Sequence, residues 1–160
     1  MLNKYVKYIF IVLIIILLIT YYYPFPISKI IASYTGIFTP ETVDLKVNFS
    51  SFLSKDFKMD DTNLVNELYS YIENLKVRRV MIPPNSYYIQ TPGWYLIRIQ
   101  SKEGKYLIIV IYNSDYISIN GKTYKLTDKM DLKKIYKLIL LDQDKEDIDE
   151  YYFNIIEEFK

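Results

Sequence analysis

The stretch that decides the fold is WYLIRIQSKEGKYLIIVIYNSDYISINGKTYKL, residues Trp94 to Leu126. Three turn signals, Lys102-Glu103-Gly104, Asn113-Ser114-Asp115 and Asn120-Gly121, separate four runs that are rich in isoleucine, valine and tyrosine. Short polar turns between such runs are typical of strands joined by hairpins. This stretch therefore predicts an antiparallel β-meander.

The length of the first loop sets the register of this meander. A three-residue loop that ends at Gly104 places Ile99 opposite Leu107. A two-residue loop would place Gln100 opposite Leu107, and a slip of one residue moves every side chain to the other face of the sheet. The three-residue loop keeps apolar residues together, so we prefer that register.

The same register continues through the next two turns. A three-residue loop at Asn113 to Asp115 sets Ile111 opposite Ile117, and a two-residue turn at Asn120-Gly121 sets Ile117 opposite Tyr124. One face of the predicted sheet is then apolar throughout, and we expect it to form the core. Its members are Tyr95, Ile97, Ile99, Leu107, Ile109, Ile111, Ile117, Ile119 and Tyr124.

The opposite face of the meander is also apolar, with Arg98 as its only interruption. It carries Trp94, Leu96, Tyr106, Ile108, Val110, Tyr112 and Tyr116. A contiguous apolar surface of this kind marks an interaction site when the chain itself does not cover it. Two accounts remain open: coverage by a predicted final helix, 148–159, or by the strand 43–49, and binding of a partner. The candidate partner surface is Trp94, Leu96, Ile108, Val110, Tyr112 and Tyr116.

The N-terminus predicts a membrane anchor. Lys4 and Lys7 precede an uncharged run from Tyr8 to Ser28, which approaches the ~20 residues that cross a bilayer. A cleaved export signal needs small residues after a shorter apolar core, and the best alternative cleavage point, after Ser33, lies far past this one. We expect residues 1–31 to be an uncleaved, single-pass anchor in the cell membrane. The two lysines predict a cytoplasmic N-terminus and a domain outside.

The remaining segments predict one extracytoplasmic α+β domain, in which helices pack on an antiparallel sheet. A linker is expected at 32–41, and the domain at 42–160. Alternating apolar residues predict a strand at 43–49, and further strands are expected at 77–82 and 86–91. Helical spacing predicts helices from Asp60 or Asp61 to about Lys76, at 129–141, and at 145–159, the last of them acidic.

Composition excludes several classes of chemistry. The 160 residues include no cysteine and no histidine, which removes disulfides, cysteine nucleophiles, Ser-His-Asp triads and His or Cys zinc sites. The net charge of +1 gives no global field for nucleic acid, and we predict no nucleic-acid partner. No cofactor is predicted.

Three patterns of catalytic or metal-binding type are weak. Asp142-Gln143-Asp144-Lys145-Glu146-Asp147 resembles the start of a calcium loop, but Asp147 and Phe153 stand where glycine and a bidentate glutamate belong. Ser51 or Ser54 beside Lys55 could form a Ser-Lys dyad, although 50–58 is typical of an ordinary polar loop. Paired carboxylates for glycoside hydrolysis cannot be located from the sequence alone.

Two basic groups are candidates for binding anionic lipid or wall polymer. One is the stripe Lys129, Lys133 and Lys137 with Lys134, and the other is the pair Arg78-Arg79. Lysines at helical spacing opposite an apolar stripe are also what a solvated helix face shows. We expect the stripe to be such a face.

The order of anchor, linker and small α+β domain resembles the layout of small membrane-anchored proteins of AT-rich Gram-positive bacteria. The resemblance covers most of the chain, rests on layout, and carries no catalytic residue across. It implies an extracytoplasmic domain. We expect a non-enzymatic binding or accessory module acting on a membrane or envelope protein; the alternative is an envelope hydrolase that uses carboxylates or a Ser-Lys dyad.

Overall fold

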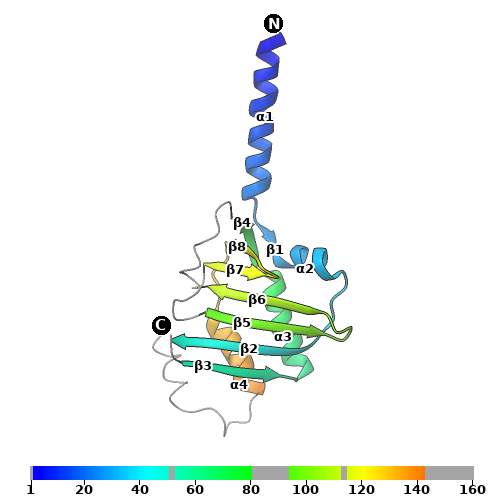
Figure 1. Ribbon diagram of the computed structural model, residues 1–160, viewed down its shortest axis with the longest axis vertical. Helices are drawn as coiled ribbons and strands as arrows, with labels where there is room; N and C mark the ends of the chain where they lie inside the picture. Colours follow the sequence, from blue (N-terminus) through cyan, green and yellow to red (C-terminus); the bar gives the residue numbers. More distant parts are fainter. Residues whose placement is uncertain (1, 51–52, 81–93, 113–114, 143–160) are drawn as a thin grey trace.

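The protein is an α+β molecule with an eight-stranded antiparallel sheet, which confirms the predicted fold class (Figure 1). The computed structural model describes residues 2–50, 53–80, 94–112 and 115–142. The helices are α1 (Leu2–Tyr22), α2 (Ile27–Thr35), α3 (Thr62–Asn74) and α4 (Leu132–Asp142). The strands are β1 (Phe25–Pro26), β2 (Pro40–Ser50), β3 (Leu53–Met59), β4 (Lys76–Arg79), β5 (Trp94–Ser101), β6 (Tyr106–Tyr112), β7 (Tyr116–Ile119) and β8 (Lys122–Leu126). Their order across the sheet is β1-β4-β8-β7-β6-β5-β2-β3.

The centre of the sheet is the meander β5 to β8, and its register confirms the prediction. Ile99 pairs with Leu107, and Ile117 pairs with both Ile111 and Tyr124. The two-residue turn between β7 and β8 has Asn120 at φ 46° and Gly121 at φ 82°. Positive φ at both positions is the geometry that an Asn-Gly hairpin turn favours.

The predicted core face is buried against α2, α3 and α4, which all lie on that side of the sheet (Figure 1). Each of these helices supplies an apolar stripe, represented by Ile31, Leu68 and Ile135. The sheet contributes Tyr95, Ile97, Ile99, Leu107, Ile109, Ile111, Ile117 and Ile119, all buried, while Tyr124 is half-buried. The sheet and the helix layer therefore share one core.

The strand predicted at 43–49 is confirmed as part of β2, but it does not cover the second face of the meander. β2 pairs edge to edge with β5 and extends the sheet. Val43, Leu45 and Val47 are buried and point to the same side as the isoleucines of β5. Because side chains alternate along a strand, these apolar residues of β2 all point into the core. None of them is left to cover the second face of the meander.

The polar loop expected at 50–58 is wrong, because Leu53–Met59 forms β3 and pairs with β2. Phe57 and Met59 are buried, whereas Asp56 and Lys58 are exposed. An edge strand shows only a short alternation of this kind, and charged side chains are common on edge strands. The charged residues of this segment made it look like a polar loop, so the strand was not predicted from the sequence.

The segment after α1 differs from the predicted anchor end and linker. Residues 27–35 form α2, which ends at Gly36 with φ 68°, and β2 begins at Pro40. Ile27, Ile30 and Ile31 are 0%, 5% and 2% exposed and belong to the domain core. Their spacing is helical, so the residues that looked like the end of the membrane run are instead the apolar stripe of a core helix.

The other predicted elements fall as follows. Asp61 is the N-cap of α3, and its carboxylate accepts hydrogen bonds from the backbone N–H groups of Asn63 (2.8 Å) and Leu64 (3.0 Å). The helix expected at 129–141 is α4, and the strand expected at 77–82 is β4. The strand at 86–91 and the helix at 145–159 lie outside the described residues.

Helix α1 extends away from the domain as a single apolar rod (Figure 1). Its residues Tyr5–Tyr22 are long and apolar enough to cross a membrane, and none of that segment is buried inside the domain. At its foot, Phe25 pairs with Val77 of β4, and Ile27 N–H donates to the Leu75 carbonyl at 2.9 Å. The chain thus passes from α1 into the sheet with only Tyr23 and Pro24 between them.

Candidate functional site

The second face of the meander places the predicted partner surface on neighbouring strands. Leu96 lies opposite Val110, and Tyr112 lies opposite Tyr116. Ile108 is 39% exposed, while Leu96, Val110, Tyr112 and Tyr116 are half-buried. We call the surface formed by Leu96, Ile108, Val110, Tyr112 and Tyr116 the outer patch. The backbone of Trp94 belongs to the same strand as Leu96, but its side chain lies outside the described part.

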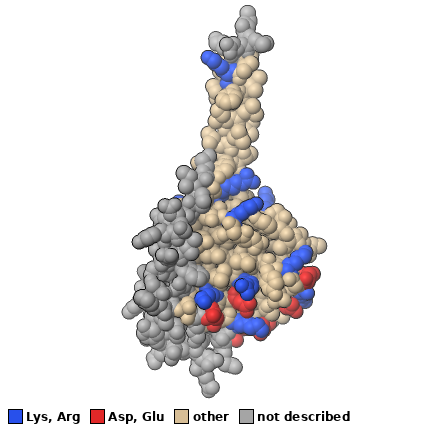
Figure 2. Space-filling view, viewed as in Figure 1, with Lys and Arg blue, Asp and Glu red and all other residues tan. Residues whose placement is uncertain are grey.

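No helix of the described residues packs on the outer patch, because α2, α3 and α4 all bury their apolar stripes in the core on the other side (Figure 1). The same face becomes charged toward β3. There Lys46 and Asp56 are paired at 3.8 Å, and Arg98 and Lys58 help to line a hollow of about 380 Å³. Figure 2 shows uncharged surface in the middle of the domain, and blue and red side by side at the end away from α1. The outer patch is thus an apolar area with a charged border.

The Ser-Lys candidates are not arranged as a catalytic dyad among the described residues. Ser54 and Lys55 are neighbours on β3, and adjacent residues of a strand point to opposite faces. Ser54 is exposed, whereas a catalytic lysine and its serine need a site shielded from water. Ser51 lies outside the described residues.

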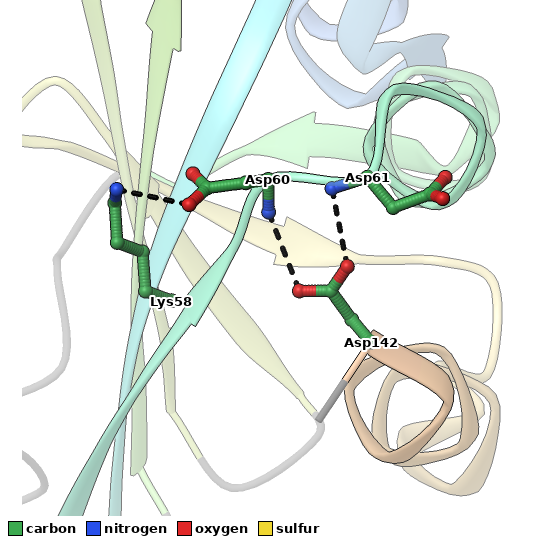
Figure 3. Close-up of polar contacts among 4 residues, drawn as sticks. All are labelled: Lys58, Asp60, Asp61 and Asp142. Carbon is green, nitrogen blue, oxygen red and sulfur yellow. Dashed lines mark hydrogen bonds and ion pairs between the residues drawn. The ribbon is translucent and has the colours of Figure 1, made fainter. Parts of the chain in front are cut away.

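The first residue of the calcium-like pattern has a structural role. The Asp142 carboxylate, at the end of α4, accepts hydrogen bonds from the backbone N–H groups of Asp60 (3.3 Å) and Asp61 (3.1 Å) (Figure 3). Asp60 also pairs with the Lys58 ammonium at 3.0 Å. The carboxylates gathered here are therefore occupied by backbone and side-chain partners. The rest of the pattern, 143–147, lies outside the described residues, and those described contain no cluster of metal-ligating side chains.

The lysines of the basic stripe lie on and just before α4. Lys129 and Lys137 are exposed. Lys134 pairs with Glu67 of α3 at 3.5 Å and lies 5.2 Å from the ring centroid of Tyr71. The side chain of Lys133 lies outside the described part. These contacts are those of a solvated helix face with one link to a neighbouring helix.

The pair Arg78-Arg79 lies elsewhere, on β4 at the foot of α1. The Arg78 guanidinium is 5.7 Å from the ring centroid of Tyr22, near the end of α1. Arg79 lies opposite Tyr124 of β8 and shares a cavity with Lys122. The structure therefore separates the two basic groups that the sequence presented as equivalent candidates.

Sequence reasoning missed one residue of these sites, Lys122, and the structural role of another, Asp142. Lys122 meets Arg79 only because β4 pairs with β8, and no local signal reports a pairing between strands so far apart in the chain. Asp142 meets Asp60 and Asp61 for a similar reason, because α4 packs beside α3. For the contact of Asp142 with Asp60 and Asp61, the only signal in the sequence was the general preference of acidic residues for the start of a helix.

Searches against protein-family models, curated proteins and solved structures found no match to this chain. The resemblance in layout to small membrane-anchored bacterial proteins therefore stays a prediction.

Proposed function

We propose that α1 is a permanent single-pass membrane anchor, and that it holds a binding or accessory module outside the cytoplasm. The module acts on another membrane or envelope protein, which docks on the outer patch. The observation that carries this proposal is the outer patch itself, an apolar and aromatic sheet face on which no described helix packs.

The core position of α2 supports a permanent anchor. Cleavage after Ser33 would separate Ile27, Ile30 and Ile31 from a core in which each is nearly inaccessible to water. Burial of one such side chain stabilises a fold by about 1.5 to 3 kcal/mol. The three together are comparable with the whole stability of an ordinary domain, about 5 to 15 kcal/mol. A mature chain that began after Ser33 would lose this contribution.

The charges at the start of α1 support the orientation. Lys4 and Lys7 lie at the N-terminal end of the apolar segment, and basic residues that flank a membrane span favour the cytoplasmic side. The domain at the other end of α1 is then outside the cell.

The outer patch supports docking by a protein. Ile108, at 39% exposed, lies on the same strand face as Tyr106 and Tyr112, and tyrosine is enriched in the centres of protein interfaces. The charged border, formed by Asp44 and Lys46 of β2, Lys58 of β3 and Arg98 of β5, provides the polar rim that such interfaces have.

The substitution Val110→Asp tests this proposal. It puts a carboxylate in the middle of the outer patch, between Leu96 and Ser118. We expect the thermal midpoint of the detergent-solubilised chain to change by only a few degrees. A photoreactive residue at Ile108 should crosslink a second protein in intact cells, and Val110→Asp should abolish this crosslink.

Thr42→Asp is the matched control, because Thr42 lies on the same sheet face of β2, outside the patch. It should leave the crosslink intact. If Val110→Asp instead lowers the stability of the purified chain by several kcal/mol, the patch is covered by the protein's own chain, because a buried unpaired carboxylate has that cost. Docking on this face would then be wrong.

A further inference from the structure

A cavity of about 390 Å³ lies where α1 meets the sheet. Tyr21, near the end of α1, forms one side of it, and Arg79 of β4 with Lys122 and Tyr124 of β8 form the other. The cavity therefore joins the last turn of the membrane helix to two cationic side chains of the domain.

The two cations of this cavity lack a carboxylate partner among the described residues. The ion pairs of the described part are Lys46–Asp56, Lys58–Asp60 and Lys134–Glu67, and none of them involves Arg79 or Lys122.

The groups that act on Lys122 are two phenols and a second cation. Tyr34 raises the pKa of the Lys122 ammonium, mainly by hydrogen bonding, Tyr124 raises it further, and the charge of Arg79 lowers it. The Lys122 ammonium lies 5.4 Å from the ring centroid of Tyr34. Two positive charges are thus held near each other, which favours an anion between them.

Two more cations lie on the other face of the same strands. Arg78 is opposite Lys125 in the pairing of β4 with β8. Arg78 lies over the ring of Tyr22, and Lys125 lies 5.7 Å from the ring centroid of Tyr116. We call Arg78, Arg79, Lys122 and Lys125 the basic collar. Figure 2 shows blue and no red on the visible described surface where α1 joins the domain.

The cavity lies at the depth of the lipid headgroups if α1 spans the membrane. Tyrosines collect at the membrane–water interface because the ring is apolar and the hydroxyl is polar. Tyr21, Tyr22 and Tyr23 mark that level at the end of α1, and Tyr21 is itself a wall of the cavity. A phosphate of the lipid layer can reach Arg79 and Lys122 without leaving its leaflet.

We propose that this cavity binds the phosphate of an anionic phospholipid headgroup in the leaflet next to the domain. Arg79 and Lys122 are the phosphate ligands, and Arg78 and Lys125 add positive potential around them. This inference rests on the proposed anchoring by α1.

The two ligands suit a phosphodiester. A guanidinium donates paired hydrogen bonds to phosphate oxygens, and an ammonium adds a compact charge. A lipid can also contact the apolar wall of the cavity: its acyl chains would pack along α1 while its phosphate contacts Arg79 and Lys122. A free phosphate ion meets only the cations.

Native mass spectrometry of the full chain in a neutral detergent tests the proposal, with phosphatidylglycerol and phosphatidylcholine offered in equal amounts. Wild type should retain phosphatidylglycerol in preference by about tenfold or more, since each basic residue near a lipid surface contributes on the order of a threefold to tenfold gain. The double substitution Arg79→Gln and Lys122→Gln should remove the preference. The control pair Lys129→Gln and Lys137→Gln, which removes the same charge from exposed positions at α4, should keep it.

Three results would overturn the lipid site: no preference in wild type, an equal loss in both double variants, or displacement of the lipid by millimolar inorganic phosphate, which would indicate a site for free phosphate. Alkaline carbonate extraction of cell membranes reports separately on anchoring. A chain that is extracted by carbonate contradicts the proposed anchor whatever lipids it retains in detergent. A chain that resists extraction but shows no lipid preference contradicts only the lipid site.

Discussion

At the scale of single residues, Asp142 shows how one carboxylate can join two helices. It comes from the last residue of α4, and it accepts the backbone N–H groups of Asp60 and Asp61 just before α3 begins (Figure 3). Those N–H groups lie at the positive end of the α3 dipole, where a negative charge is stabilising. Lys58 offsets the repulsion among the carboxylates by pairing with Asp60, and this bond raises the pKa of Lys58.

The substitution Asp142→Asn should lower the free energy of unfolding by about 1 kcal/mol. An amide can accept only one of the two hydrogen bonds, and it turns an N–H₂ toward the other donor. Urea denaturation of the domain measures the change. Asp56→Asn is the matched control, because Asp56 is exposed and its ion pair with Lys46 is a long one, at 3.8 Å. Equal effects of the two substitutions would contradict the bridging role of Asp142.

At the scale of elements, the meander could be predicted from the sequence because every constraint on it is local. Each turn is two or three residues long, and each register follows from keeping isoleucines on one face. The pairings of β4 with β8 and of β2 with β5 join distant segments, and local pattern carries no information about them. The lipid-binding cavity depends on one of these distant pairings, which is why only Arg78 and Arg79 stood out beforehand.

The two edges of the sheet are blocked in different ways. β3 carries Lys55, Asp56 and Lys58, and charges on an edge strand discourage pairing with another molecule. β1 has two residues, one of which is Pro26, so it offers little backbone for pairing. Neither edge strand therefore favours pairing with another molecule, and the proposed association through the outer patch does not involve them.

The α2 helix gives a test of the boundary between anchor and domain. Ile31→Ala should destabilise the domain by about 2 to 5 kcal/mol, because Ile31 is 2% exposed. Ile37→Ala, the same change at a side chain that is 87% exposed, should cost under about 0.5 kcal/mol. Urea denaturation of a fragment that begins at Tyr23, and so keeps β1 and α2, measures both. Equal small effects would mean that α2 does not belong to the core.

At the scale of the whole molecule, the β1–β4 edge of the sheet lies at the foot of α1, and β3 is the strand farthest from α1 (Figure 1). Strands in a sheet are about 4.8 Å apart, so the eight strands extend roughly 30 to 35 Å from first to last. If α1 spans the membrane as proposed, the outer patch, on β5, β6 and β7, lies roughly 15 to 25 Å above the membrane edge. A protein that docks as proposed would have to present its own surface at that height.

Orientation is tested with protease added to intact spheroplasts. We expect digestion of the domain and, before digestion, an intact mass that includes the N-terminal segment. Leu17→Lys should weaken insertion by ~3 kcal/mol, whereas Ile37→Lys, outside the apolar helix, should leave insertion unchanged. Full protection of the domain until the membrane is lysed would place it in the cytoplasm instead.

The strand order also determines when the sheet can form during synthesis. The four central strands are the last to be made, whereas β1 to β4, which occupy the flanks, emerge first. A ribosome adds about 5 to 20 residues per second, so β2 waits several seconds for β5, the central strand with which it pairs. Until β8 is complete, the isoleucines of α2 lack the central strands against which they pack in the folded domain. If the chain is exported as proposed, its first half must therefore pass through an interval in which it has no complete sheet to protect it from proteases and from neighbouring nascent chains.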